Sequence, residues 1–265
     1  MSVVSTARVL IVVPTIGTRL EFLDRCLDSI ASQSIPVDIV IVAPDSDGVR
    51  DRAERVGAQL LPDPGSLAGA INVGVASAGP QHEFVNWLGD DDLLEPGSLK
   101  LTTAALDANP DAVVAYGACR YIDADDTELW VSQAGPWASR ILSWGPDLIP
   151  QPGMLVRADA WRTVGGVDAS YRFAFDLDLL LKLKAIGRLH DVGAVVSSFR
   201  WHPDSLTVGD RTTNLQESER AKRASLGPTA RRLAWMWEGP VRVATRFAAN
   251  EVTRRAHRAA AKANA

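Results

Sequence analysis

The chain has 265 residues, of which 46% are hydrophobic and 23% are charged, and its formal net charge at pH 7 is -4. This composition is typical of a soluble globular protein that can bury a sizeable core in one large domain. No apolar run approaches the roughly 20 residues that cross a bilayer, and the N-terminus lacks a basic segment before its apolar stretch. We therefore expect a cytoplasmic protein, with Cys26 and Cys119 as free buried thiols.

The charge is distributed unevenly along the chain. Residues 211–265 hold 12 Lys and Arg against 4 Glu, whereas residues 1–210 hold 16 Lys and Arg against 28 Asp and Glu. An acidic body argues against nucleic acid as its main ligand, while the basic end leaves an anionic partner open. The sequence thus predicts a body over residues 1–210 and a basic tail over residues 211–265.

In the first part of the chain, short β-branched runs alternate with segments of helical periodicity. The predicted strands are 8–14, 38–42, 59–61 and 83–88, and the predicted helices are 19–33, 49–56 and 67–78. Strand–helix–strand units of this length predict a mostly parallel sheet with helices on both faces. Ligands of such sheets bind beyond the carboxyl ends of the strands.

The rest of the body has a mixed pattern. Helices are predicted over 98–108, 157–164 and 176–186, and strands over 112–121 and 192–200. The segment 123–152 is rich in turn residues and tryptophan and has no clear period. The tail has a helical composition with breaks at Gly227-Pro228 and Gly239-Pro240, which predicts a C-terminal helical appendage.

Three adjacent carboxylates, Asp90, Asp91 and Asp92, follow the fourth predicted strand. Adjacent anions repel one another unless a cation or hydrogen-bond donors compensate them. One interpretation is a solvated turn with a helix N-cap. The other is a site for Mg²⁺ or Mn²⁺, which prefer carboxylate oxygens and bridge to phosphate. The loops after Pro14 and Ala43 end at the same edge of the predicted sheet, so three loops converge on one crevice.

Six motifs in order resemble family 2 glycosyltransferases, a nucleotide-sugar-dependent group with the GT-A fold. The motifs are Val12-Val13-Pro14-Thr15, Gly69-Ala70-Ile71-Asn72-Val73-Gly74, Trp87-Leu88-Gly89-Asp90-Asp91-Asp92, Gly165-Gly166-Val167-Asp168, Phe175-Asp176-Leu177-Asp178 and Arg200-Trp201-His202. The resemblance implies a Rossmann-like, mostly parallel sheet flanked by helices. It also implies a nucleotide-binding half over residues 1–110 and an acceptor-binding half over residues 111–210.

The resemblance implies roles for individual residues at the donor. Asp91 matches the ligand of Mn²⁺ or Mg²⁺ at the donor diphosphate, although Gly89 stands where many members have the first Asp of the motif. His202 matches a further metal ligand, or else is a surface residue. The residues implied at the nucleotide are Pro14, Thr15 and Asp45 for the base, Asp90 for the ribose, Asn72 for the neighbouring helix, and Arg200 for the phosphates or simply the end of a strand.

Asp176 matches the general base of the family. A carboxylate there can take the proton of an acceptor hydroxyl while the oxygen attacks the anomeric carbon from the face opposite the leaving diphosphate, which inverts that centre. An N-cap of the following helix is the alternative. Phe175 replaces the glutamate usual before this base, and Asp178 is expected to be structural.

The expected function is therefore inverting, metal-dependent transfer of a sugar from a nucleoside diphosphate donor, with UDP or dTDP preferred, to a hydroxyl of a glycan or lipid-linked acceptor. A catalytically silent nucleotide-binding scaffold and a nucleotidyltransferase are the alternatives. Trp137, Trp144 and Trp161 are either an acceptor wall or core residues.

The tail mixes apolar, aromatic and arginine residues. This mixture suits a helix on an anionic membrane, and peripheral contact with the inner face of the cell membrane is one interpretation. Packing on the body or on a second subunit would look the same, so a homo-oligomer is also left open. The sugar, the base and the acceptor linkage do not follow from the sequence.

Overall fold

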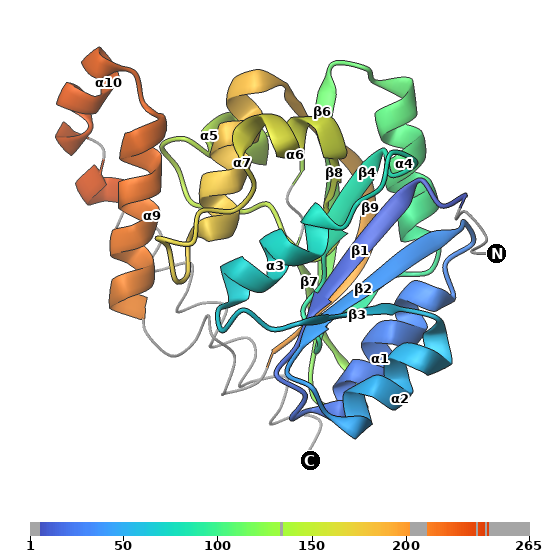
Figure 1. Cartoon of the computed structure of the whole chain (residues 1–265). Helices are drawn as coiled ribbons and strands as arrows, with labels where there is room; N and C mark the ends of the chain where they lie inside the picture. Colours follow the sequence, from blue (N-terminus) through green and yellow to red (C-terminus); the bar gives the residue numbers. More distant parts are fainter. Residues whose placement is uncertain (1–5, 133–134, 202–210, 237, 242, 244–265) are drawn as a thin grey trace.

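The computed structural model describes residues 6–132, 135–201, 211–236, 238–241 and 243. These residues build one nine-stranded sheet in the order β3-β2-β1-β4-β8-β6-β9-β5, with β7 paired to β6 (Figure 1). The strands are β1 (Val9–Pro14), β2 (Val37–Ala43), β3 (Gln59–Pro62), β4 (Phe84–Trp87), β5 (Leu93–Leu94), β6 (Ala112–Ile122), β7 (Glu128–Ser132), β8 (Leu155–Arg157) and β9 (Arg188–Arg200).

The predicted parallel arrangement is confirmed for the first half of the sheet. β1 pairs in parallel with β2 and β4, and β2 pairs in parallel with β3. The second half is mixed: β6 and β9 are parallel, whereas β8 lies antiparallel between β4 and β6. The short strands β5 and β7 are also antiparallel to their neighbours, and the sequence pattern did not predict these three strands.

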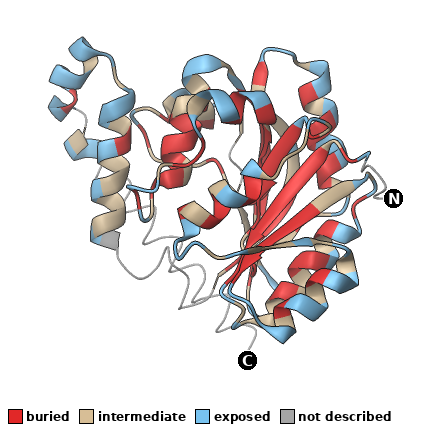
Figure 2. Cartoon of the chain, viewed as in Figure 1, coloured by how far each residue is buried: buried red, intermediate tan, exposed pale blue. Residues whose placement is uncertain are grey.

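Helices cover both faces of the sheet. They are α1 (Leu20–Ala31), α2 (Asp47–Val56), α3 (Leu67–Ala76), α4 (Ser98–Ala108), α5 (Ala138–Ile141), α6 (Ala158–Val164), α7 (Phe175–Ile186), α9 (Arg211–Ser225) and α10 (Pro228–Leu233). Buried residues form two cores (Figure 2). Side chains of β1 alternate between them, with Leu10 and Val12 facing α3 and α7, and Ile11 facing α1 and α4.

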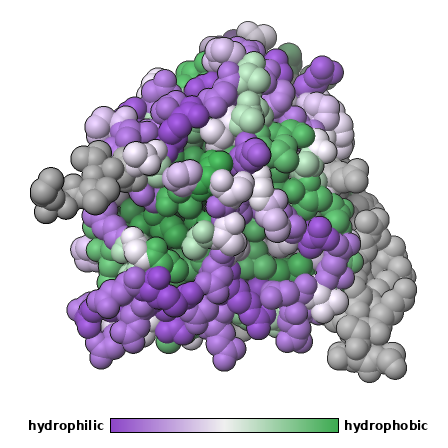
Figure 3. Space-filling view, turned by 90° about the vertical axis from the view of Figure 1, so that its right-hand side faces the viewer, coloured by the Kyte–Doolittle hydropathy of each residue, from purple (hydrophilic) through white to green (hydrophobic). Residues whose placement is uncertain are grey.

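The outer surfaces of α1 and α2 are charged. Arg52 pairs with Asp24 at 2.7 Å, and Arg55 pairs with Asp28 at 2.5 Å. Figure 3 shows hydrophilic residues across the lower part of this side of the molecule, at the height of these helices in Figure 1. The two helices thus present an apolar stripe to the sheet and an ion-paired surface to solvent.

Helix α3 lies unusually close to β1. A Cβ atom on Gly74 would be 2.3 Å from Cγ1 of Val12, a separation that real Cβ atoms do not show. Any larger residue at position 74 would clash with β1, so this close approach requires glycine.

Helix α9 lies beside α7, and α10 lies on the outer side of α9, at the edge of the molecule farthest from α1 (Figure 1). Ala221 of α9 is 1% exposed and belongs to the same core as α7. The predicted break at Gly227-Pro228 separates the two helices. None of the helices in the described part of the chain is long and apolar enough to cross a membrane. Cys26 and Cys119 are buried and free, as expected.

Candidate active site

A cleft of about 1620 Å³ opens beyond the carboxyl ends of β1 and β4. One wall consists of the loops after these strands and carries Thr15 and Asp91. The opposite wall consists of residues 143–152, the segment 172–177 and α9, and it carries Asp176. The chain thus brings Pro14, Thr15, Asp90, Asp91 and Asp176 together in a single cleft, although they are up to 162 positions apart in the sequence.

One arginine compensates two of the adjacent aspartates. Arg19 contacts Oδ1 of Asp90 through Nη2 at 2.8 Å and Oδ2 of Asp91 through Nη1 at 2.7 Å. Thr15 Oγ1 donates to the other oxygen of Asp90 at 2.5 Å. Burial raises the pKa of Asp90, although the bonds from Thr15 and Arg19 lower it. The expected need for a compensating cation is therefore met here by a side chain that sequence reasoning did not single out.

The third aspartate of the triplet joins two strands of the sheet. Oδ1 of Asp92 accepts the backbone N–H of Arg200 at 3.0 Å, and the residue is 5% exposed. Burial raises its pKa, and the charge of Asp91 raises it further. The helix-cap interpretation is wrong for Asp92, because the next helix, α4, has Gly97 as its N-cap.

Arg200 lies behind the triplet and does not line the cleft. Its side chain is fully buried, its Nε donates to the carbonyl of Asp91 at 2.9 Å, and Nη2 contacts Asp126 at 2.5 Å. Its guanidinium stacks over the ring of Phe22 at 4.5 Å. These contacts fix the backbone of the triplet. The placement of Arg200 therefore favours a structural role at the end of β9 over a contact with phosphate.

Two further residues predicted at the nucleotide also lie away from the cleft. The side chain of Asp45 is 80% exposed and pairs with Arg50 at 2.6 Å. Asn72 exchanges two hydrogen bonds with the backbone of Val167, at 2.8 and 3.1 Å, and so ties α3 to the loop after α6. Asp63, which follows β3, lines the cleft instead and was not predicted.

The tryptophans divide between the core and the surface. Trp161 is 4% exposed and packs edge-on against Trp87, with ring centroids 5.8 Å apart, so its core interpretation is correct. Trp137 and Trp144 are each 49% exposed, and only Trp144 lines the cleft. Phe175 packs against Trp87 at 6.1 Å, which makes this part of the cleft wall apolar where the family usually has a charge.

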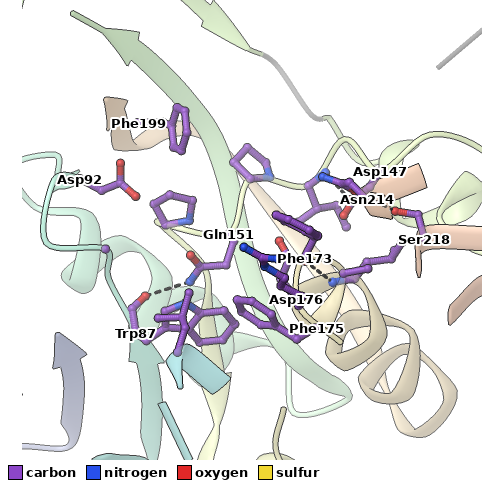
Figure 4. Close-up of a pocket in the computed structure, with 18 of the residues that line it drawn as sticks. Trp87, Asp92, Asp147, Gln151, Phe173, Phe175, Asp176, Phe199, Asn214 and Ser218 are labelled. Atoms are coloured by element: carbon purple, nitrogen blue, oxygen red, sulfur yellow. Dashed lines mark hydrogen bonds between the residues drawn. The ribbon is translucent and has the colours of Figure 1, made fainter. Parts of the chain in front are cut away.

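Asp176 lies in the first turn of α7 and lines the cleft (Figure 4). Its Oδ1 accepts the N–H of the next residue, Leu177, at 2.7 Å, but Ala174 is the N-cap, so the N-cap alternative is wrong. Removal of water by the surrounding walls raises the pKa of Asp176. Asp178 is buried and pairs with Lys182 at 2.6 Å, which is the structural role expected for it.

A second carboxylate, Asp147, lies in the same part of the cleft and was not predicted (Figure 4). Its pKa is raised by desolvation and then by the charge of Asp176, while Lys222 of α9 lowers it. Gln151 of the same segment donates to the carbonyl of Trp87 at 2.9 Å. The segment is therefore anchored on β4 and presents its carboxylate toward the side of Asp176.

Asp91 and His202 are the residues predicted to hold Mg²⁺ or Mn²⁺. The carboxylate of Asp91 lines the cleft and supplies the hard oxygen donors that Mg²⁺ and Mn²⁺ prefer. Among the described residues, no group of three or more His, Cys, Asp and Glu is arranged to hold a metal ion. His202, the further predicted ligand, lies outside the described residues. The carboxylate of Asp91 is therefore suited to bind a divalent cation, although in this structure it pairs with Arg19.

Comparisons with known proteins identify the family of this chain. A model of the family described as Glycosyl transferase family 2 matches residues 10–176. The O-antigen biosynthesis protein RfbC of Myxococcus xanthus is 27% identical over 188 residues, which are 65% of this chain. The chain covers 14% of that protein.

Solved structures share the fold. The structure of S. aureus TarS 1-349 in complex with UDP-GlcNAc matches with a TM-score of 0.64 at 15% identity. The match covers 86% of this chain and 70% of the TarS chain. The mannosyltransferase PcManGT from Pyrobaculum calidifontis, in complex with GDP-Man and Mn2+, matches with a TM-score of 0.63 at 19% identity. The match covers 96% of this chain and 75% of the PcManGT chain. At these identities the likeness shows the fold alone.

Proposed function

Because the chain belongs to glycosyl transferase family 2 and is a glycosyltransferase, we propose that it transfers a sugar from a nucleoside diphosphate donor to an acceptor hydroxyl with inversion. One observation supports this most: a single cleft holds Asp90 and Asp91 on one wall and Asp176 on the other. Such a cleft has room for a donor at the first wall and an acceptor at the second.

The donor end is proposed at the loops after β1, β3 and β4. Pro14, Thr15 and Asp63 line the space for the nucleoside, and Asp90 would contact the ribose. A uridine or thymidine diphosphate sugar is our first choice. The solved neighbours in complex with UDP-GlcNAc and with GDP-Man support a nucleotide sugar in this region of the fold.

Asp91 would hold Mn²⁺ or Mg²⁺, as the complex of PcManGT with Mn2+ supports. When bound, the cation would neutralise the diphosphate that leaves the sugar. Arg19 would then have to release Asp91, and because its side chain also lines the cleft, the freed guanidinium could bind the donor phosphates.

Asp176 would act as the general base. Its carboxylate takes the proton of the acceptor hydroxyl, the acceptor oxygen forms the new bond to the anomeric carbon, and the bond to the diphosphate breaks with its electron pair leaving on phosphate. The raised pKa of Asp176 suits a group that has to accept a proton near neutral pH. Because the acceptor oxygen attacks the anomeric carbon from the side opposite the leaving diphosphate, the configuration of that carbon is inverted.

The acceptor is proposed to be a glycan or a lipid-linked saccharide. Trp144 offers an exposed aromatic face at the acceptor wall, and Asn214 and Ser218 of α9 offer polar contacts (Figure 4). A related protein named for O-antigen biosynthesis supports a role in polysaccharide assembly.

A thermal-shift panel tests the donor assignment. Purified protein is heated with uridine, thymidine, guanosine and cytidine diphosphates, each with and without Mn²⁺, because a ligand of the native state raises its stability. A shift for one nucleotide that requires Mn²⁺ supports the proposal, and no shift for any nucleotide contradicts it. Nucleotide binding without turnover on a broad acceptor screen would favour the silent scaffold, and release of pyrophosphate would identify a nucleotidyltransferase.

Contact with the cytoplasmic face of a membrane is proposed for the tail. Leu233, Trp235 and Met236 are 45%, 71% and 58% exposed, and they follow Arg231 and Arg232. Exposed apolar groups beside arginine suit the surface of an anionic bilayer. This contact would bring a lipid-linked acceptor to the cleft wall that α9 helps to form.

A further inference from the structure

The segment that carries Asp176 is held by a helix from outside the family match. Residues 172–174 lead into α7, and their backbone N–H groups converge on the carboxylate of Glu217, which lies on α9. Arg172 donates to both carboxylate oxygens at 3.0 Å, and Phe173 and Ala174 donate to Oε2 at 2.7 and 3.1 Å. Three successive N–H groups therefore bind one side chain from a distant part of the sequence.

These contacts fix the chain just before α7, at the N-cap residue Ala174 and the two residues that precede it. The N-cap residue, Ala174, has no side-chain oxygen to accept the first free N–H groups of the helix. Burial raises the pKa of Glu217, but the hydrogen bonds from the three N–H groups lower it more, and the net shift is downward. The carboxylate therefore stays charged at the positive end of the helix, where an anion is favoured.

The neighbouring residues of α9 strengthen the same attachment. Arg220 donates to the carbonyl of Ser170 at 2.9 Å, and its guanidinium lies 3.9 Å over the ring of Tyr171. Lys222 donates to the carbonyl of Gly145 at 2.5 Å, two residues before Asp147. One helix thus contacts both the segment that carries Asp147 and the segment that carries Asp176.

We propose that Glu217 is a positioning residue for the base: it fixes the segment 172–174 and thereby sets where the carboxylate of Asp176 meets the acceptor hydroxyl. The inference rests on the proposed function of Asp176. Glu217 does not contact the reacting atoms. Its effect is transmitted through two residues of backbone to the first turn of α7, and a small displacement of a catalytic group is enough to slow a reaction strongly.

Two substitutions and a control test the inference. Glu217→Ala removes all four hydrogen bonds, and Glu217→Gln keeps one oxygen that can accept them. Glu54→Gln makes the same chemical change on the exposed surface of α2, away from the cleft. Release of nucleoside diphosphate is measured with UDP-GlcNAc and GDP-Man in the presence of Mn²⁺, with water as the acceptor. Hydrogen exchange of the peptide covering residues 170–176 reports whether the N–H groups have lost their acceptor.

We expect Glu217→Ala to lower kcat on the order of tenfold while the KM for the donor changes by less than about twofold. Glu217→Gln should lose less, Glu54→Gln should match the wild type, and exchange should accelerate in the 170–176 peptide of Glu217→Ala. Equal kcat in Glu217→Ala and the wild type would overturn the inference, as would a loss confined to KM. If Glu217→Ala fails to fold, Glu217→Gln alone decides. A wild-type protein that is inactive on every donor would instead remove the proposed function, and the inference with it.

Discussion

Arg19 and Asp91 form an ion pair of 2.7 Å at the wall of the cleft where the donor diphosphate is proposed. The same guanidinium also contacts Asp90. Two adjacent carboxylates are thereby compensated by a single side chain from the loop after β1. Asp91 is also the carboxylate proposed to hold a divalent cation, so Arg19 and that cation would compete for the same oxygens.

Replacing Arg19 by Ala should lower stability without metal and enlarge the stabilisation by Mn²⁺. The reason is that Asp90 and Asp91 lose their compensating charge. Because Arg19 is partly exposed, we expect a loss of about 1 kcal/mol in metal-free protein. The measurement is the midpoint of thermal unfolding with and without Mn²⁺. Equal midpoints for variant and wild type in both conditions would contradict the competition.

Replacing Asp91 by Asn should abolish metal-dependent binding of the nucleoside diphosphate. The substitution keeps the size of the side chain but removes the anionic oxygens that a hard cation requires. Binding is followed by calorimetry with the nucleotide selected in the thermal-shift panel. The control is Asp51→Asn, the same change at an exposed position of α2. Metal-dependent binding that survives in Asp91→Asn would show that the cation is held elsewhere.

Replacing Asp176 by Asn should spare donor binding and lower turnover by about 10²–10⁴, the usual contribution of a general base. The matched control is Asp178→Asn, two residues further along α7, where the carboxylate pairs with Lys182. That variant should lose thermal stability and keep its turnover per folded molecule. Near-normal turnover of Asp176→Asn would mean that the base is assigned wrongly.

The pH dependence of kcat should reflect Asp147 and Asp176 together. Both pKa values are raised, so the active, deprotonated base should be lost as pH falls through a range above that of an ordinary carboxyl, about 4. Asp147→Asn removes a neighbouring negative charge, so Asp176 should ionise more easily and the acidic limb should move to lower pH. A limb that stays in place would show that the two carboxylates titrate independently.

Replacing Trp235 by Ala should weaken binding to vesicles that contain anionic lipid by about threefold, because an exposed aromatic group is lost from the interface. Co-sedimentation with anionic and with neutral vesicles gives the comparison. Trp137→Ala, an exposed tryptophan of the body, is the control. If both variants bind anionic vesicles like the wild type, the tail does not contact the membrane through this residue.

Much of the fold could be predicted from local pattern. β1 and β4 are buried throughout and β2 is buried over its last five residues, and such apolar runs indicate parallel strands without any tertiary information. β5 and β8 have only two and three residues, which is too short for a period to be visible. Their pairing depends on long-range contacts, so the antiparallel part of the sheet was missed.

The site was predictable where a motif follows a strand. Thr15 and Asp91 lie at the cleft for that reason, whereas Asp176 reaches it from the first turn of α7. The side chains of Asn72 and Arg200 bind the backbone of neighbouring segments. The sequence alone does not show whether such a side chain points into the cleft or away from it. Arg19 and Glu217 have no motif around them. Arg19 depends on partners 71 and 72 residues away, and Glu217 depends on partners 43 to 45 residues away.

The short strand β8 also limits how the cleft can move. It belongs to the half of the chain predicted to bind the acceptor, yet it pairs with β4, the strand that precedes Asp90 and Asp91, and with β6 on its other side. The two halves therefore share one hydrogen-bonded sheet, and a hinge between them would have to break that sheet. Any closure around substrates would therefore come from the loops at the edge of the sheet, while the donor and acceptor halves keep one fixed relative position.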